Sequence, residues 1–163
     1  MSIQVSYLTK SIKIVLPLKS HNAADKQTGS IGDVEISLIN DDNIVTCYEM
    51  KDKRVQIEDI HHAIEKINSM KTRVDNYIFI TTDLIEDEVK EYARQLYDKI
   101  GIEIAILDCL GFIKHYLHFF HRYRHKFLEI YQELVLKEPN SSVGQPLKEA
   151  FLALRRAAES DKA

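Results

Sequence analysis

Two acids and a lysine lie in two short segments that have the alternation of neighbouring strands. The first segment is Gly32-Asp33-Val34-Glu35-Ile36, and the second, Val45–Lys51, ends in Glu49-Met50-Lys51. Hydrolysis of a phosphodiester needs a hard divalent cation, which neutralises phosphate charge and acidifies the attacking water. Such cations prefer carboxylate and carbonyl oxygens. The residue types therefore predict a magnesium-dependent nuclease site.

Each of these residues has an expected role. Side chains alternate faces along a strand, so Glu49 and Lys51 point the same way and the Met50 carbonyl lies between them. We expect Asp33, Glu49 and the Met50 carbonyl to bind Mg²⁺. The Lys51 ammonium would orient the water or help to deprotonate it, and would oppose the charge of the pentacoordinate phosphate.

The pairing of the two strands decides whether the acids can meet. A two-residue turn would place Asp33 and Glu49 on opposite faces, because a shift of one residue exchanges the faces of a strand. An odd-length turn instead pairs Asp33 with Glu49 and Glu35 with Cys47. The hypothesis therefore requires an odd turn or a bulge within residues 40–43, whose Asn and Asp residues tolerate left-handed conformations. The structural alternative is that Glu-x-Lys and Gly-Asp occur by chance in a strand and a turn.

Three segments resemble the catalytic part of type II restriction endonucleases of the PD-(D/E)XK superfamily, most closely the SacI family. They are His21-Asn22-Ala23-Ala24-Asp25, Thr28-Gly29-Ser30-Ile31-Gly32-Asp33-Val34-Glu35 and Tyr48-Glu49-Met50-Lys51-Asp52-Lys53. The resemblance covers about residues 20–60 and the rest of the chain in outline. One departure is that Ile31-Gly32 stands where the superfamily's name places proline.

The resemblance implies a catalytic triad of Asp33, Glu49 and Lys51. It also implies that Gln56 opens the following helix near the site, with Asp25 and Glu35 as supporting acids.

The expected reaction is Mg²⁺-dependent cleavage of double-stranded DNA at a short specific sequence, leaving 5′-phosphate and 3′-hydroxyl ends. The chain is short for a full enzyme of this family, which implies a catalytic portion whose sequence-reading region is absent or supplied by another polypeptide. Two alternatives stay open: a repair-type or non-specific nuclease of the same fold, and a non-catalytic interaction module.

The order of elements predicts an α/β fold with a restriction-endonuclease-like core. An antiparallel meander is followed by strand-helix-strand, giving a mixed sheet flanked by helices, with further helices at the C-terminus. Strands are expected at 4–8, 13–18, 33–39, 43–51, 76–81 and 102–107, and helices at 57–70 and 86–99, the latter ending at Gly101.

The C-terminal third is expected to begin with one long helix, 110–136, within a nuclease core of residues 1–137. Its polar side is basic, and the candidates for DNA contact are Lys114, His118, Arg122 and Lys126. The alternative is a packing helix with a solvated basic face, while zinc binding by a pair of histidines one turn apart is disfavoured by the surrounding residues.

A linker (138–146) and a helix (147–159) are expected to follow. This last helix would dock on the core or on a partner, and a second copy would make a homodimer able to cut both strands.

The composition suits a single compact domain. The chain has 163 residues, 45% of them hydrophobic, and a formal net charge of −3. This charge gives no bulk attraction to DNA, so any DNA contact depends on local clusters of cations. Cys47 and Cys109 are expected to be reduced thiols, and no apolar run approaches the length of a membrane span, which predicts a cytoplasmic protein.

Overall fold

The computed structural model describes residues 13–15, 30–38, 43–70 and 73–160. The strand expected at 4–8 and the candidate Asp25 lie outside these residues. The strands are β1 (Lys13–Val15), β2 (Val34–Leu38), β3 (Ile44–Lys51), β4 (Val74–Thr81) and β5 (Glu103–Asp108). The helices are α3 (Ile57–Met70), α4 (Asp87–Ile100), α5 (Cys109–Phe119), the 3₁₀ turn η1 (His121–Tyr123), α6 (Arg124–Lys137) and α7 (Gln145–Ser160).

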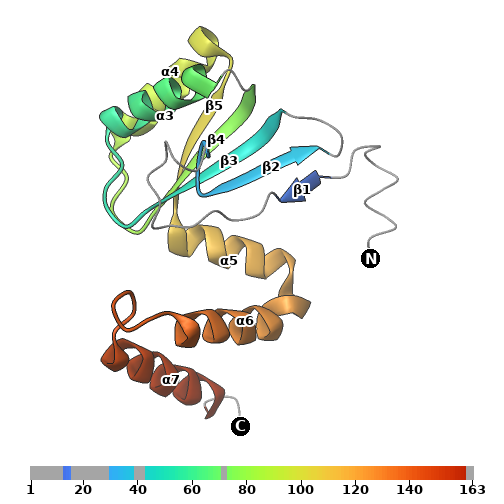
Figure 1. Cartoon of the computed structure of the whole chain (residues 1–163), viewed down its shortest axis with the longest axis vertical. Helices are drawn as coiled ribbons and strands as arrows, with labels where there is room; N and C mark the ends of the chain where they lie inside the picture. Colours follow the sequence, from blue (N-terminus) through green and yellow to red (C-terminus); the bar gives the residue numbers. More distant parts are fainter. Residues whose placement is uncertain (1–12, 16–29, 39–42, 71–72, 161–163) are drawn as a thin grey trace. The chain divides into compact units, whose positions relative to one another are not determined.

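The five strands form one mixed sheet in the order β1-β2-β3-β4-β5 (Figure 1). The pairs β1–β2 and β2–β3 are antiparallel, and β3–β4 and β4–β5 are parallel. Helices α3 and α4 provide the crossovers that two parallel pairs require. The predicted α/β class, with its meander, its strand-helix-strand half and its C-terminal helices, is confirmed.

The β2–β3 pairing has the predicted register. Glu35 pairs with Cys47, and the register shifts between Ile36, which pairs with Thr46, and Ser37, which pairs with Ile44. Val45 is therefore the extra residue of a β-bulge, because it stands between two paired residues of β3 while Ile36 and Ser37 are consecutive in β2. The bulge lies inside β3 and not within 40–43, where we expected it; residues 40–42 are outside the described part of the chain.

The hydrophobic core lies between the sheet and helices α3 and α4, which cover the same face (Figure 1). From the sheet, Tyr77 and Phe79 are each 1% exposed, and their rings pack at 5.0 Å between centroids. From the helices come Ile60, Ala63, Ile67, Val89, Ala93 and Leu96. The helix α4 ends as predicted at Gly101, whose φ of 69° is the left-handed conformation that favours glycine at this position.

The chain forms two compact units, residues 1–114 and 115–163. The division falls inside the segment expected to be one helix, and that expectation is wrong. Helix α5 ends at Phe119, and Phe120 has φ −108° and ψ 44°, which is not helical. Aromatic residues and histidine have modest helix propensity, and this segment contains many of them. The Arg124 Nε donates to the Leu117 carbonyl oxygen at 2.9 Å, so a side chain caps the carbonyl end of α5.

Within the second unit, α6 and α7 are joined by polar and aromatic contacts. The buried Lys148 ammonium donates to the carbonyl oxygens of Leu136 and Glu138, at the end of α6. The rings of Tyr131 and Phe151 meet edge to face with their centroids 5.6 Å apart. The expected C-terminal helix is confirmed, although it begins two residues before the predicted start.

Candidate functional site

The loop before β2 approaches β3 closely at Gly32. A Cβ atom at this position would overlap the Cys47 Sγ and would lie 2.7 Å from the Tyr48 carbonyl oxygen. Contacts this short are not tolerated, so glycine is required by the approach of the two backbones. This explains why glycine precedes Asp33 in this chain.

Asp33 is held against the end of β3. Its backbone N–H donates to the Tyr48 carbonyl at 2.9 Å, and its Oδ2 accepts from the Met50 N–H at 2.7 Å. The N–H and C=O of one strand residue point to the same side, so the Met50 carbonyl also points to the β2 side. The strand register begins with Val34 paired to Tyr48, and extending it by one residue places Asp33 opposite Glu49.

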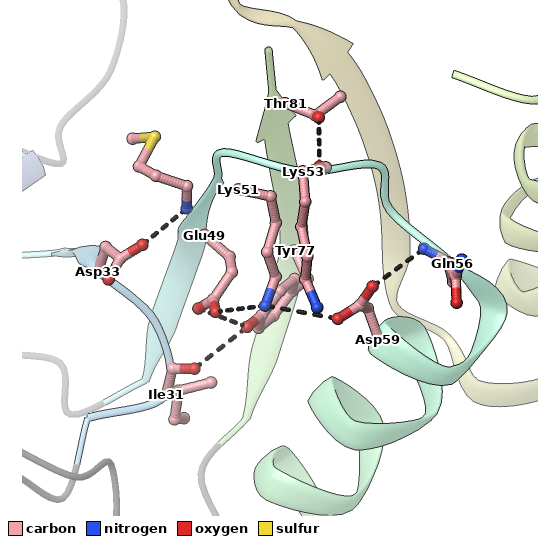
Figure 2. A network of polar contacts seen from close by, with 10 residues as sticks. Ile31, Asp33, Glu49, Lys51, Lys53, Gln56, Asp59, Tyr77 and Thr81 are labelled. Atoms are coloured by element: carbon pink, nitrogen blue, oxygen red, sulfur yellow. Dashed lines mark hydrogen bonds and ion pairs between the residues drawn. The ribbon is translucent and has the colours of Figure 1, made fainter. Parts of the chain in front are cut away.

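Glu49 is held by a buried tyrosine. The Tyr77 hydroxyl lies 3.2 Å from the Glu49 Oε2 and 3.2 Å from the Ile31 carbonyl oxygen (Figure 2). Its single proton is shared between these two acceptors. Burial raises the pKa of the Tyr77 hydroxyl, and the negative charges of Glu49 and Asp33 raise it further. Both carboxylates are therefore within electrostatic reach of the same hydroxyl.

Lys51 lies between two carboxylates. Its Nζ is 3.2 Å from the Glu49 Oε1 and 3.5 Å from the Asp59 Oδ1 (Figure 2). Burial opposes the charged form, but the ion pairs and hydrogen bonds with Glu49 and Asp59 outweigh burial and raise the pKa of Lys51. The ion pairs hold the ammonium in place, while the side chain as a whole is 22% exposed.

Glu35 faces the loop that precedes it. Its side chain is buried, and its Oε1 accepts from the Ser30 hydroxyl at 3.0 Å and from the Ile31 N–H at 2.6 Å. The carboxylate thereby fixes the residues that lead into Gly32 and Asp33. We interpret Glu35 as the anchor of this loop, while its supporting role in the chemistry stays a prediction.

Gln56 stands directly before α3, as predicted. Its side chain is exposed, and its backbone N–H donates to the Asp59 Oδ2 at 3.0 Å, which caps the helix. Asp59 and Tyr77 are the two residues around the triad that sequence analysis missed. The spacing Gln56-x-x-Asp59 at a helix start was a signal for Asp59, whereas Tyr77 was visible only as part of an apolar strand.

The donor set fits a hard cation. Asp33 and Glu49 offer carboxylate oxygens and Met50 offers a carbonyl, which are the oxygen ligands that Mg²⁺ accepts alongside water. Within the described residues, no group of three His, Cys, Asp or Glu side chains is placed to hold a metal ion. A metal here would therefore depend on two carboxylates, a main-chain oxygen and water.

The four basic candidates do not share one helix. Lys114 and His118 are on α5, Arg122 is in η1 and Lys126 is on α6. All four are exposed. The break at Phe120 therefore corrects the expectation of one continuous basic face.

A comparison with protein families finds a match for the first half of the chain. Residues 4–82 match the family model described as the SacI restriction endonuclease C-terminal domain. This region contains β1 to β4 and α3, including all three members of the predicted triad. No curated protein matches the chain.

The mixed sheet and the helices that cover it define an α/β domain. The matched part of the chain is therefore similar to a domain of a restriction endonuclease, which agrees with the resemblance of its segments. Cys47 is buried and Cys109 is partly exposed, and both are free thiols. Among the helices that the structure describes, none has the length and apolar character needed to cross a membrane.

Proposed function

We propose that this chain is a Mg²⁺-dependent endonuclease that hydrolyses phosphodiester bonds of double-stranded DNA, as a type II restriction enzyme or its catalytic domain. The observation that carries the proposal is the Lys51–Glu49 ion pair at the end of β3, with Asp33 bonded to the Met50 N–H of the same strand. The family match supports the nuclease class.

Asp33, Glu49 and the Met50 carbonyl would hold the ion. When bound, Mg²⁺ polarises the phosphate and lowers the pKa of a coordinated water. Asp33 is restrained by the Met50 N–H, and Glu49 by Tyr77 and Lys51, so both carboxylates are positioned before any ligand arrives.

Lys51 would act as a cation. The ion pairs with Glu49 and Asp59 favour the ammonium form of Lys51, which can donate hydrogen bonds but has no lone pair to accept a proton. Its proposed role is therefore to orient the attacking water and to oppose the charge that develops on the phosphate. Loss of such a preorganised charge lowers a rate by about 100-fold to 1,000-fold.

A plasmid assay tests this function. The full chain is incubated with supercoiled DNA and Mg²⁺, and is compared with the Asp33→Asn, Glu49→Gln and Lys51→Ala variants. Lys53→Ala is the matched control, because that exposed lysine lies two residues beyond Lys51. We expect cleavage by the parent and the control, and at least about 100-fold slower cleavage by the other three variants.

The products distinguish the alternatives. Discrete fragments indicate a restriction enzyme, and a smear indicates a non-specific nuclease of the same fold. A folded parent that neither cleaves DNA nor binds Mn²⁺ would contradict the proposal and favour a non-catalytic interaction module.

The basic segment 109–128 is the proposed additional DNA contact. It contains no aspartate or glutamate, and its Lys114, Arg122 and Lys126 side chains are exposed. Replacing these three residues by alanine should weaken DNA binding and lower the slope of log affinity against log salt by about 0.9 for each phosphate that the protein no longer neutralises. An unchanged slope would show that these three side chains do not contact the DNA phosphates.

A further inference from the structure

Asp59 stands out among the charged groups near the triad. It comes from α3, whereas Glu49 and Lys51 come from β3, and it is the second carboxylate against the Lys51 ammonium (Figure 2). Its side chain is only 14% exposed. The contact therefore lies at the edge of the site and is largely shielded from solvent.

The helix start fixes the position of Asp59. Its backbone N–H donates to the Gln56 carbonyl at 3.1 Å, and its Oδ2 accepts from the Gln56 N–H at 3.0 Å. This reciprocal pair uses one carboxylate oxygen and leaves Oδ1 for Lys51. Asp59 is thus a rigid partner for a flexible lysine.

A divalent cation at Glu49 would compete with Lys51. Both are positive, so binding of the ion beside Glu49 weakens the hold of that carboxylate on the ammonium. Without a second partner, Lys51 would either obstruct the cation or turn away from the site. Asp59 lies on the other side of the ammonium and offers it a carboxylate that the predicted metal ligands do not include.

We infer that Asp59 is a positioning residue, which retains Lys51 beside the reacting phosphate when a divalent cation occupies Glu49. The inference rests on the proposed function. It goes beyond the triad, since Asp59 acts through Lys51 and contacts neither the metal nor the DNA.

The first experiment measures Mn²⁺ binding to the full chain by calorimetry, without DNA. Asp59→Asn removes the charge but keeps an oxygen that can accept from the Gln56 N–H, so the helix start is preserved. Glu58→Gln is the matched control, because Glu58 is an exposed acid in the same helical turn. We expect Asp59→Asn to weaken Mn²⁺ binding by about threefold to tenfold, and the control to bind like the parent.

A double-mutant cycle separates positioning from a general charge effect. If Asp59 acts through Lys51, its substitution costs Mn²⁺ affinity mainly when Lys51 is present and much less in the Lys51→Ala background. A loss of equal size in both backgrounds would overturn the inference, since it would reflect only one fewer negative charge near the metal.

Cleavage kinetics give the second readout. Asp59→Asn should lower kcat by about tenfold with little change in the KM for DNA, because Lys51 is misplaced while the groups that bind DNA remain. Unchanged kcat together with unchanged Mn²⁺ affinity would refute the role of Asp59 and leave the nuclease proposal intact. A parent that shows neither Mn²⁺ binding nor cleavage would instead overturn the proposed function itself.

Discussion

The carboxylate of Asp33 and the backbone N–H of Met50 are joined by a 2.7 Å hydrogen bond. This bond connects the loop before β2 to the end of β3, two residues of which are Glu49 and Lys51. It therefore fixes one predicted metal ligand relative to the other two members of the predicted triad. The loop can lie this close to β3 only because residue 32 has no side chain.

Gly32→Ala should destabilise the protein and displace Asp33. The new methyl group would meet the Tyr48 carbonyl at 2.7 Å, and that atom belongs to the backbone of a central strand. We expect the free energy of unfolding to fall by about 1–3 kcal/mol, the usual cost of overpacking. Denaturant unfolding measures this change, and Mn²⁺ affinity and cleavage should fall with it.

Gly144→Ala is the control for that substitution. A Cβ at Gly144 would meet only the Pro146 Cδ, at 3.8 Å, which is ordinary contact. Its unfolding free energy should stay close to that of the parent. Equal stability of the two variants would show that the loop has room to move away from β3.

The sequence allowed a prediction of the strand pairing, because alternation restricts which residues can share a face. The requirement that Asp33 lie opposite Glu49 predicted an odd register, and the Glu35–Cys47 pair confirms it. The position of the bulge at Val45 could not be predicted, since a bulge anywhere between the two acids has the same effect on their faces.

Two other features depended on contacts distant in sequence. Tyr77 joins the Ile31 carbonyl to Glu49 from 46 and 28 residues away, and nothing in its own strand distinguishes its hydroxyl from a packing group. The end of α5 at Phe119 was missed because the apolar spacing continues through the break. The cap from Arg124 to Leu117 is a tertiary detail that periodicity does not contain.

Substitution by glutamine should mainly reduce stability at Glu35 and mainly reduce Mn²⁺ binding at Glu49. Glu35→Gln loses a charged acceptor for the Ser30 hydroxyl and the Ile31 N–H, so the free energy of unfolding should fall by about 1–3 kcal/mol. Its Mn²⁺ affinity should stay near that of the parent. Glu49→Gln, the matched variant, should lose Mn²⁺ binding with a smaller change in stability. Calorimetry measures Mn²⁺ binding of the two variants, and denaturant unfolding measures their stability. If both variants lost Mn²⁺ binding equally, Glu35 would be a metal ligand as well.

Stability should decline at alkaline pH because of Cys47. Burial raises the pKa of this thiol, and the charges of Glu35 and Glu49 raise it further. Above the unfolded thiol pKa of about 8.5, the unfolded chain loses a proton that the folded chain keeps. The free energy of unfolding should then fall by about 1.4 kcal/mol for each pH unit, until the folded pKa is reached.

Cys47→Ala removes that contribution. Unfolding curves between about pH 8 and 10, which bracket the usual thiol pKa, should show a flatter decline for this variant than for the parent, whatever its stability at neutral pH. Cys109→Ala leaves the buried thiol in place and should decline like the parent. If the free energy of unfolding fell equally steeply with pH in all three proteins, Cys47 would not be the cause of the loss of stability at alkaline pH.

Tyr77→Phe tests whether the buried hydroxyl positions Glu49. The substitution keeps the ring in the core but removes the donor to Glu49 and to the Ile31 carbonyl, so the free energy of unfolding should fall by about 1–3 kcal/mol. Under the proposed function, Glu49 then has one restraint fewer, and cleavage should slow by about tenfold with little change in KM for DNA. Tyr97→Phe, at an exposed position, is the control and should match the parent in both measurements. If Tyr77→Phe were less stable but cleaved at the parent's rate, the hydroxyl would contribute only to folding. Lys51 would then be sufficient to hold the Glu49 carboxylate.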